Sequence, residues 1–295
     1  MFSSAVVSSV FKPSDLSNLT AWFDAADSST ITSDSDGVSQ WSDKSGNNYH
    51  GTQSTNAKKP TLGTSADNGL VAINFSNPSD TVNGKSLQTT DPIWSYTERT
   101  YFVVCNKTAN SARMSPMAQA YFRLKTVESA TSGILFAGDG SDSSFGDNTD
   151  EVYGLSGSFN GADSRSAKLS DTADGVDVVL QQSLKHVASG ASGGFMFAQK
   201  NAEAKVDQDQ TSSGVVSSTV TDGADGQSKT TVGVIGITMA IGGYNTSFVS
   251  NSSTVLTPIA FWDGSIQEIC EYNRNLSDAE RNQVMGYLLG KWRVT

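Results

Sequence analysis

The sequence has few charged residues, only two histidines and no long apolar run. Asp, Glu, Lys and Arg make up 17% of the 295 residues, and 30 acidic residues against 20 basic ones give a net charge of −10. Because nucleic acids and anionic membranes attract basic surfaces, this balance argues against both as partners. The sequence contains no stretch of about 18 apolar residues, so no segment is predicted to cross a membrane.

Cysteine is scarce too, which excludes a disulfide-stapled mini-domain. Cys105 and Cys270 each lie in an apolar, strand-like run, YFVVC and IQEIC. Buried free thiols are the usual interpretation of cysteines in such runs. A single bridge between the two stays open as the alternative, provided that their strands are neighbours.

Glycine, serine, threonine, asparagine and aspartate fill the sequence instead, and they favour strands and turns over helices. Short apolar runs alternate with turn dipeptides such as Asp36-Gly37, which is typical of antiparallel sheets. The absence of alternating helices argues against a doubly wound α/β fold. Strands are predicted at 19–24, 37–41, 70–75, 100–106, 120–125, 133–137, 152–159, 176–180, 194–199, 229–236, 237–242 and 264–272.

One helix is predicted, close to the end of the sequence. Ser277 and Glu280 have the spacing of a capping box, in which each side chain bonds the other residue's backbone N–H. The helix should end at about Trp292, and its apolar stripe should pack onto the rest of the domain. That stripe consists of Val284, Met285, Leu288, Leu289 and Trp292.

The chain is divided into an N-terminal arm, residues 1–14, and one domain, residues 15–295. No repeat with a period of 20 to 50 residues is present, which argues against a repeat architecture. The polar stretches 138–151 and 206–228 are predicted to be long surface loops.

Both ends of the sequence resemble a known family, the concanavalin A-like lectin/glucanase superfamily in its laminin-G-like form, common in phage and bacterial surface proteins. The stretches that carry the resemblance are LTAWFDAADSSTIT, GVSQWSDKSGNNYHGTQ, KKPTL, GLVAINFSNPSD and, at the back, FWDGSIQEICEYNRNLSDAERNQVMGYLLGKW. The resemblance implies an all-β fold, a two-sheet antiparallel jelly-roll sandwich with a C-terminal capping helix at about 277–292.

Hydrolases of that superfamily place acidic residues as Glu-x-Asp-x-x-Glu on one strand, and this pattern is absent. Glu268 and Glu271 are three apart in a predicted strand, so their side chains should point to opposite faces and cannot act as a pair. We therefore predict that the chain is not an enzyme, and a polysaccharide-degrading hydrolase is the third of three hypotheses.

Sugar binding needs an aromatic face with hydrogen-bonding groups around it. The resemblance places Trp22, Trp41 and Trp262 in the core, and Trp292 belongs to the helix stripe. The remaining carbohydrate-binding candidates, each with loop anchoring as its alternative role, are Tyr244, Asn245, Tyr153, Trp94 and Tyr49.

No cofactor is required by any motif, and calcium is the ion that the sequence favours if one is bound. Four carboxylates crowd one loop rich in Gly and Ser, and oxygen ligands in flexible loops suit this cation. A solvated acidic loop without an ion is the alternative. The four residues are Asp139, Asp142, Asp147 and Asp150.

The first hypothesis is a non-enzymatic phage virion surface protein, a head decoration or a fibre or tail component, that binds host or environmental polysaccharide. Residues 1–12 lack the basic region of a secretory signal, which favours release by lysis over export. The expected partners are other virion proteins, held through the arm, and cell-surface polysaccharide, with a homo-oligomer left open. A bacterial secreted or surface adhesin is the second hypothesis.

Overall fold

The structure is a computed structural model, and its described part consists of thirteen stretches of the chain. Every structural statement below concerns these residues. They are residues 11–76, 84–89, 98–108, 114–122, 129–137, 151–158, 165–169, 173–185, 195–207, 210–211, 239–247, 257–259 and 261–295.

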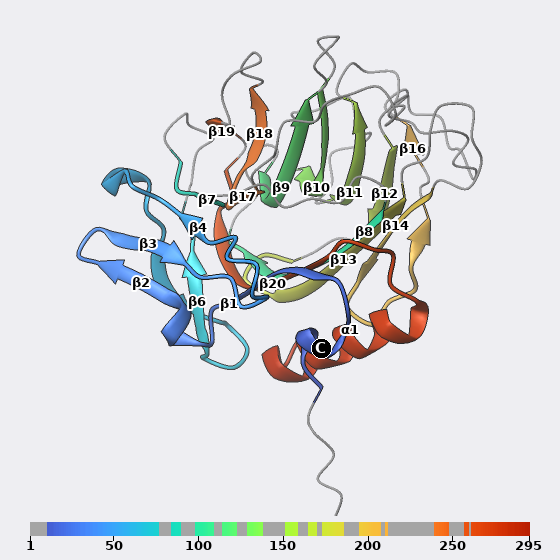
Figure 1. The fold of residues 1–295 in the computed structure, drawn as a ribbon, viewed down its shortest axis with the longest axis horizontal. Coiled ribbons are helices and arrows are strands. Elements are labelled where there is room, and N and C mark those ends of the chain that lie inside the picture. Colours follow the sequence, from blue (N-terminus) through green and yellow to red (C-terminus); the bar gives the residue numbers. More distant parts are fainter. Residues whose placement is uncertain are drawn as a thin grey trace, which may run out of the picture.

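Two antiparallel sheets face each other in a sandwich (Figure 1). The first, sheet A, has eight strands, and β1 pairs with β20 off the main path. In spatial order sheet A consists of β15 (Val206–Asp207), β14 (Phe195–Lys200), β13 (Asp177–Lys185), β8 (Glu98–Lys107), β20 (Gly264–Tyr272), β6 (Val71–Asn74) and β5 (Thr61–Thr64), with β1 (Leu19–Asp24).

The second sheet, sheet B, has ten strands, and a separate pair is formed by β18 (Tyr244–Ser247) and β19 (Thr257–Ile259). In spatial order sheet B consists of β16 (Gln210–Thr211), β12 (Arg165–Leu169), β11 (Glu151–Ser158), β10 (Ser129–Ala137), β9 (Met114–Phe122), β17 (Met239–Ile241), β7 (Leu87–Thr89), β4 (Gly51–Thr52), β3 (Gly37–Trp41) and β2 (Ile31–Asp34). Short 3-10 turns are η1 (Pro13–Asp15), η2 (Ser28–Thr30) and η3 (Asn56–Lys58).

Helix α1 (Asp278–Trp292) covers the face of sheet A that points away from sheet B (Figure 1). Ser277 is its N-cap and forms the predicted capping box with Glu280. The helix ends at Arg293, whose φ of 55° places it in the left-handed region. The predicted all-β sandwich with a C-terminal helix is therefore confirmed.

Sheet A has apolar residues on both faces because it packs against two neighbours. One core cluster, which includes Phe23, Trp41, Val103 and Ile269, lies between the sheets. The other lies between sheet A and α1 and includes Trp22 and the apolar stripe of the helix. Strands in the middle of such a three-layer arrangement are apolar throughout, as the run from Tyr101 to Cys105 is.

The predicted strands 19–24, 37–41 and 264–272 match β1, β3 and β20 residue for residue. The predicted loop at 206–228 is wrong at its start, because β15 and β16 lie there as short strands. Both add to sheet edges, and two-residue strands leave too little alternation in a sequence to be recognised.

The two cysteines are free although their strands are neighbours. Cys105 faces the core between the sheets, and Cys270 faces α1. A disulfide cannot form through a sheet, so the alternative of a bridge is excluded. Burial raises the pKa of both thiols well above its usual value, as expected for structural cysteines.

The first described residues and the C-terminus both lie beside α1, on the side of sheet A away from sheet B (Figure 1). Phe11 packs edge-on against Tyr287 of the helix, with ring centroids 6.2 Å apart. Tyr272 donates a hydrogen bond to the carbonyl of the buried Pro13 at 2.9 Å. Within the described part of the chain, no helix has the length and apolar character needed to span a membrane.

Candidate functional site

Polar side chains occur on both faces of the central strand β20. Glu268 lies on the face covered by α1, in register with Val104 of β8. Glu271 follows Ile269 on the face toward sheet B, because side chains two apart in a strand share a face. The prediction that these two glutamates lie on opposite faces is confirmed, and each belongs to a different polar cluster.

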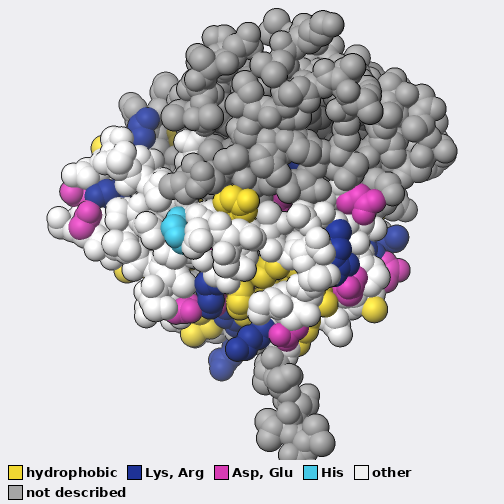
Figure 2. Space-filling view, in the orientation of Figure 1, with side chains coloured by type: hydrophobic (Ala, Val, Ile, Leu, Met, Phe, Trp, Pro, Cys, Tyr) yellow, Lys and Arg dark blue, Asp and Glu magenta, His cyan; other side chains and the backbone are white. Residues whose placement is uncertain are grey.

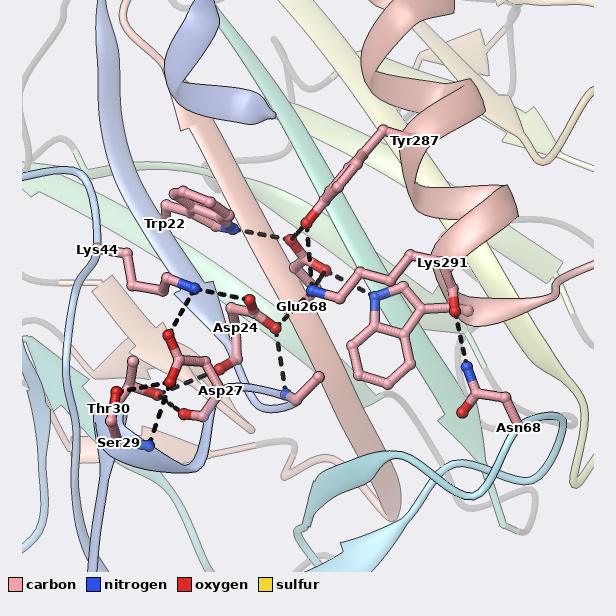
Figure 3. A network of polar contacts seen from close by, with 12 residues as sticks. Trp22, Asp24, Asp27, Ser29, Thr30, Lys44, Asn68, Glu268, Tyr287 and Lys291 are labelled. Atoms are coloured by element: carbon pink, nitrogen blue, oxygen red, sulfur yellow. Dashed lines mark hydrogen bonds and ion pairs between the residues drawn. The ribbon is translucent and has the colours of Figure 1, made fainter. Parts of the chain in front are cut away.

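Glu268 is completely buried and accepts hydrogen bonds from four side chains (Figure 3). Its Oε1 atom accepts from Trp22 Nε1 at 2.8 Å and from the Tyr287 hydroxyl at 3.2 Å. Its Oε2 atom accepts from Lys291 Nζ and from Trp292 Nε1, both at 2.7 Å. Two strands and the helix thus meet at one carboxylate.

The Lys291 ammonium connects Glu268 to a second carboxylate. Its Nζ donates to Asp24 Oδ1 at 2.6 Å and to the Tyr287 oxygen at 3.2 Å, in addition to Glu268. Asp24 Oδ2 accepts from Lys44 Nζ at 2.9 Å, and Lys44 also pairs with Asp27 at 2.8 Å. The chain of alternating charges therefore runs from the helix to the loop after β1 (Figure 3).

The pKa values reflect this geometry. Burial raises the pKa of Glu268, and the charge of Lys291 opposes the rise. Hydrogen bonds from Lys44 and Ser29 lower the pKa of Asp27 to about 2. Burial also raises the pKa of the Tyr287 phenol, which is therefore neutral at pH 7.

The contacts of the Glu268 cluster indicate that it joins α1 to sheet A and that it does not bind a substrate. A carboxylate has about four lone-pair sites, and all four donors are already in place. An ammonium has three protons, and Lys291 has three acceptors. With every position filled by the protein itself, no atom of this cluster is available to a substrate, and we interpret it as a lock between helix and sheet.

The second cluster lies between the sheets, at the end of sheet A where β8 begins and β13 and β20 end. Tyr101 of β8 stands between Gln182 of β13 and Glu271 of β20 in the strand register. Arg99 lies two residues before Tyr101 on the same face, and its Nη1 donates to the Tyr101 hydroxyl at 2.6 Å. We call Arg99, Tyr101, Gln182 and Glu271 the rim row.

The rim row is buried, with at most 6% of any of the four residues exposed. Tyr101 also belongs to the hydrophobic cluster between the sheets, so the row lies directly beside apolar side chains. Since buried polar groups are costly unless hydrogen-bonded, four of them in adjacent positions form a distinct chemical environment. Together they offer a guanidinium, a phenol, an amide and a carboxylate, the groups that bind sugar hydroxyls.

Sequence reasoning missed Arg99, Tyr101 and Gln182. The signal available was weak: Arg99 lies two positions before Tyr101, the first residue of the run YFVVC, which places both on one face of the strand. That this face meets Glu271 depends on the pairing of β8 with β20, which connects residues far apart in the sequence.

The structure places only part of the predicted carbohydrate-binding set. Tyr49 is partly buried against the core between the sheets, and its backbone N–H donates to Asp43 at 3.2 Å. Tyr153 lies in β11 of sheet B, whereas Tyr244 and Asn245 lie in β18 of the two-stranded sheet, so these residues are not on neighbouring strands. Trp94 lies outside the described residues.

The four aspartates of the predicted calcium loop, Asp139, Asp142, Asp147 and Asp150, also lie outside the described residues. Within the described stretches, no group of three or more His, Cys, Asp or Glu side chains is arranged to hold a metal ion. Trp22, Trp41, Trp262 and Trp292 are all buried, as their predicted packing role requires.

Neither a family model nor a curated protein sequence matches this chain, but solved structures do. Trypanosoma rangeli sialidase, in complex with a difluorinated nononic acid, has a TM-score of 0.52 at 12% identity over 95% of this chain. The chain spans about a third of that sialidase, 34% of its length. This likeness shows the fold alone.

Two further similar structures are domain 4 of AbnA, an extracellular GH43 arabinanase from Geobacillus stearothermophilus, in complex with arabinotriose, and the alginate lyase Aly36B. The arabinanase domain has a TM-score of 0.49 at 14% identity, covering 89% of this chain and 96% of that domain. The lyase has a TM-score of 0.42 at 10% identity, covering 88% and 97%. The structural neighbours are thus carbohydrate-related proteins, while the resemblance to the concanavalin A-like superfamily is not confirmed.

The sialidase corrects the prediction that the chain is not an enzyme. It is an enzyme, and this chain matches a third of its length, so this likeness does not permit catalysis to be excluded. The prediction was wrong because it tested a single acidic pattern on one strand, whereas chemistry on a shared fold depends on the side chains that each member carries.

Proposed function

We propose that this chain is a carbohydrate-binding β-sandwich whose sugar site is the rim row. The observation that carries the proposal is the presence of Arg99, Tyr101, Gln182 and Glu271 side by side on one face of three adjacent strands, next to the hydrophobic cluster between the sheets. A sugar presents hydroxyls that need both donors and acceptors, and this row supplies both. The carbohydrate-related structural neighbours support the same class of ligand.

Position supports the proposal as well. The row lies at the strand ends, where loops meet the sheet, and binding residues concentrate at such edges. Trp94, an aromatic candidate from the sequence, precedes the first residue of β8, Glu98, by four positions. The first described residues, the C-terminus and α1 lie on the face of sheet A away from sheet B, whereas the rim row lies on the face toward sheet B (Figure 1).

The test is binding of the purified chain to an array of bacterial and algal glycans. Glu271→Gln keeps the shape of the side chain and removes the charged acceptor, so we expect at least about a tenfold loss of affinity for any glycan bound. Asp36→Asn makes the same chemical change on an exposed turn and should leave binding unchanged. Equal binding by both variants would place the sugar site elsewhere.

The bound glycans are then incubated with the chain and assayed for cleavage. Release of new reducing ends or of unsaturated products, lost in Glu271→Gln, would assign a catalytic role to the row. Binding without cleavage would assign recognition. The absence of binding to every glycan would overturn the proposed function, provided that the chain is folded by circular dichroism.

For the setting, we propose a virion surface to which residues 1–14 attach the domain, with a bacterial adhesin as the alternative. The packing of Phe11 and Pro13 against Tyr287 and Tyr272 supports an arm that is rooted firmly in the domain. Deleting residues 1–10 should abolish incorporation into particles while the domain stays folded. Unchanged incorporation would contradict the attachment role.

A further inference from the structure

Strand β5 is the last strand of sheet A, and among the described residues no strand pairs with its outer side beyond Pro60. It pairs with β6 through Thr61↔Asn74 to Thr64↔Val71. The Ser65 N–H continues this ladder by donating to Leu70 at 2.8 Å, whereas the Pro60 carbonyl accepts from Val38 of β3 at 2.7 Å. Since backbone groups alternate along a strand, Leu62 and Thr64 direct their N–H and C=O groups outward.

The side chains of this edge are unusually apolar. Among the residues that the structure describes, three large hydrophobic side chains are exposed: Leu62 at 50%, Val176 at 45% and Leu70 at 36%. Leu62 pairs with Ile73, which belongs to the core between the sheets. Leu62 therefore continues the apolar face of the core beyond the last strand.

The other two hydrophobic residues lie at the same corner. Leu70 follows the turn after β5 directly. Val176 precedes Asp177, whose buried carboxylate accepts from the Ser65 hydroxyl and, at 3.4 Å, from the Asp67 backbone N–H. Asp177 thus ties the loop that carries Val176 to the turn between β5 and β6.

Exposed apolar edge strands are templates for pairing with another strand, and natural sheets usually protect them with lysine, proline or a covering loop. In β5 the four residues Thr-Leu-Gly-Thr contain neither charge nor proline. A second copy of the same strand fits such an edge, because an antiparallel pairing around a two-fold axis satisfies both edges at once.

The charges at the two ends of β5 fit this arrangement. Lys58 lies just before the strand, and Asp67 lies in the turn just after it. Antiparallel pairing brings the Lys58 end of one copy toward the Asp67 end of the other. Burial and the nearby charge of Asp177 raise the pKa of Asp67, so a cation placed there would relieve this repulsion.

We propose that two copies of this chain pair through β5 in an antiparallel, two-fold arrangement that joins their A sheets into one. The pairing adds backbone hydrogen bonds at Leu62 and Thr64 and buries Leu62 of each copy. It does not involve the rim row, which contains residues of β8, β13 and β20.

The test is the mass of the full chain in solution across a wide concentration range, by sedimentation equilibrium. Leu62→Lys should raise the dimer dissociation constant at least about tenfold, because it removes an apolar contact and adds like charges at the axis. Thr64→Pro should do the same by removing an N–H that points away from β6, and Thr64→Val is its matched control.

A charge exchange makes the test specific. Lys58→Glu alone and Asp67→Lys alone should each weaken the dimer, and the double variant should restore it. A chain that is monomeric at all concentrations would overturn the proposal. A dimer that survives both Leu62→Lys and Thr64→Pro would place the interface on another surface, with circular dichroism confirming that each variant is folded.

Discussion

Glu268 and Glu271 lie three residues apart on one strand, yet their surroundings differ in kind. On the α1 side, Glu268 meets four donors, and they come from β1 and the helix. On the side toward sheet B, Glu271 stands in a row with Tyr101 and Gln182 at the rim. The same residue type thus joins the helix to the sheet on one face and belongs to the proposed sugar site on the other.

The difference teaches where to look for function in this sandwich. Glu268 lies in a network that joins α1 to sheet A, whereas Glu271 lies in a row of four polar side chains on the face toward sheet B, where we propose that a sugar binds. Surface charge does not indicate which region binds a ligand. On the face seen in Figure 2, acidic and basic side chains of the described residues are interspersed.

The largest loss of stability is expected when Glu268, at the centre of the cluster between α1 and sheet A, is replaced. Glu268→Ala removes one of the three acceptors of the Lys291 ammonium and the carboxylate that accepts from two buried indole N–H groups. Breaking a buried charge pair from one side costs about 3–5 kcal/mol, so we expect the free energy of unfolding to fall by that amount. Urea unfolding at neutral pH measures it.

The matched change on the opposite face is Glu271→Gln, which keeps the volume of the side chain. If the comparison holds, this variant loses clearly less stability than Glu268→Gln, because the Glu268 site is fitted to two charged oxygens. Equal losses at the two positions would contradict the division between a structural face and a binding face.

A somewhat smaller effect with a definite pH dependence is expected for Lys291→Met. The folded protein already raises the pKa of Glu268 by burial, and Lys291 opposes that rise. Without the ammonium the pKa rises further, so the folded state holds the proton more tightly than the unfolded state does. The stability that protonated Glu268 contributes is then fully present below the ordinary glutamate pKa of 4.5. It is lost as the pH rises through the pKa of Glu268 in the folded state.

The measurement is the free energy of unfolding of both proteins from pH 4.5 to neutral pH. The gap between wild type and Lys291→Met should widen as the pH rises, because ionised Glu268 needs the missing cation. Parallel curves would show that Glu268 and Lys291 are not linked as the contacts indicate.

The features of the two faces that could be predicted from the sequence are those whose contacting residues lie close together along the chain. The capping box from Ser277 to Glu280 and the apolar stripe of α1 are local, and both were predicted. The strand pattern at 264–272 even separated the faces of Glu268 and Glu271. These features depend on neighbours within a few residues, which a sequence displays directly.

The partners of each glutamate could not be predicted in the same way. Trp22 and Glu268 are separated by 246 positions, and the rim row depends on the order of β13, β8 and β20. Long-range pairing is set by the burial of whole strands, and no local spacing encodes it. The aromatic candidates were therefore chosen by residue type, and the row of Arg99, Tyr101 and Gln182 was missed.

A smaller loss of stability is expected from removing one tyrosine hydroxyl on each face of sheet A. Tyr101→Phe removes the hydroxyl that Arg99 contacts in the rim row, and Tyr272→Phe removes the hydroxyl that donates to Pro13 on the α1 side. Each should lower the free energy of unfolding by about 1–3 kcal/mol, because a buried polar partner is left unsatisfied. Only Tyr101→Phe should weaken glycan binding, as measured on the array. Weakening by both variants would indicate a general loosening rather than a site.

The smallest effect is a gain in stability on the α1 side. Gly286 and Gly290 are exposed within the helix, and a Cβ atom at either position would meet nothing within 4 Å. Glycine in a helix interior is less favourable than alanine by about 0.5–1 kcal/mol, so Gly286→Ala should raise the free energy of unfolding by this amount. Urea unfolding should show the gain while glycan binding stays unchanged, since the substitution touches neither Glu268 nor the rim row. A loss of stability would mean that this helix face is closely packed against something other than solvent.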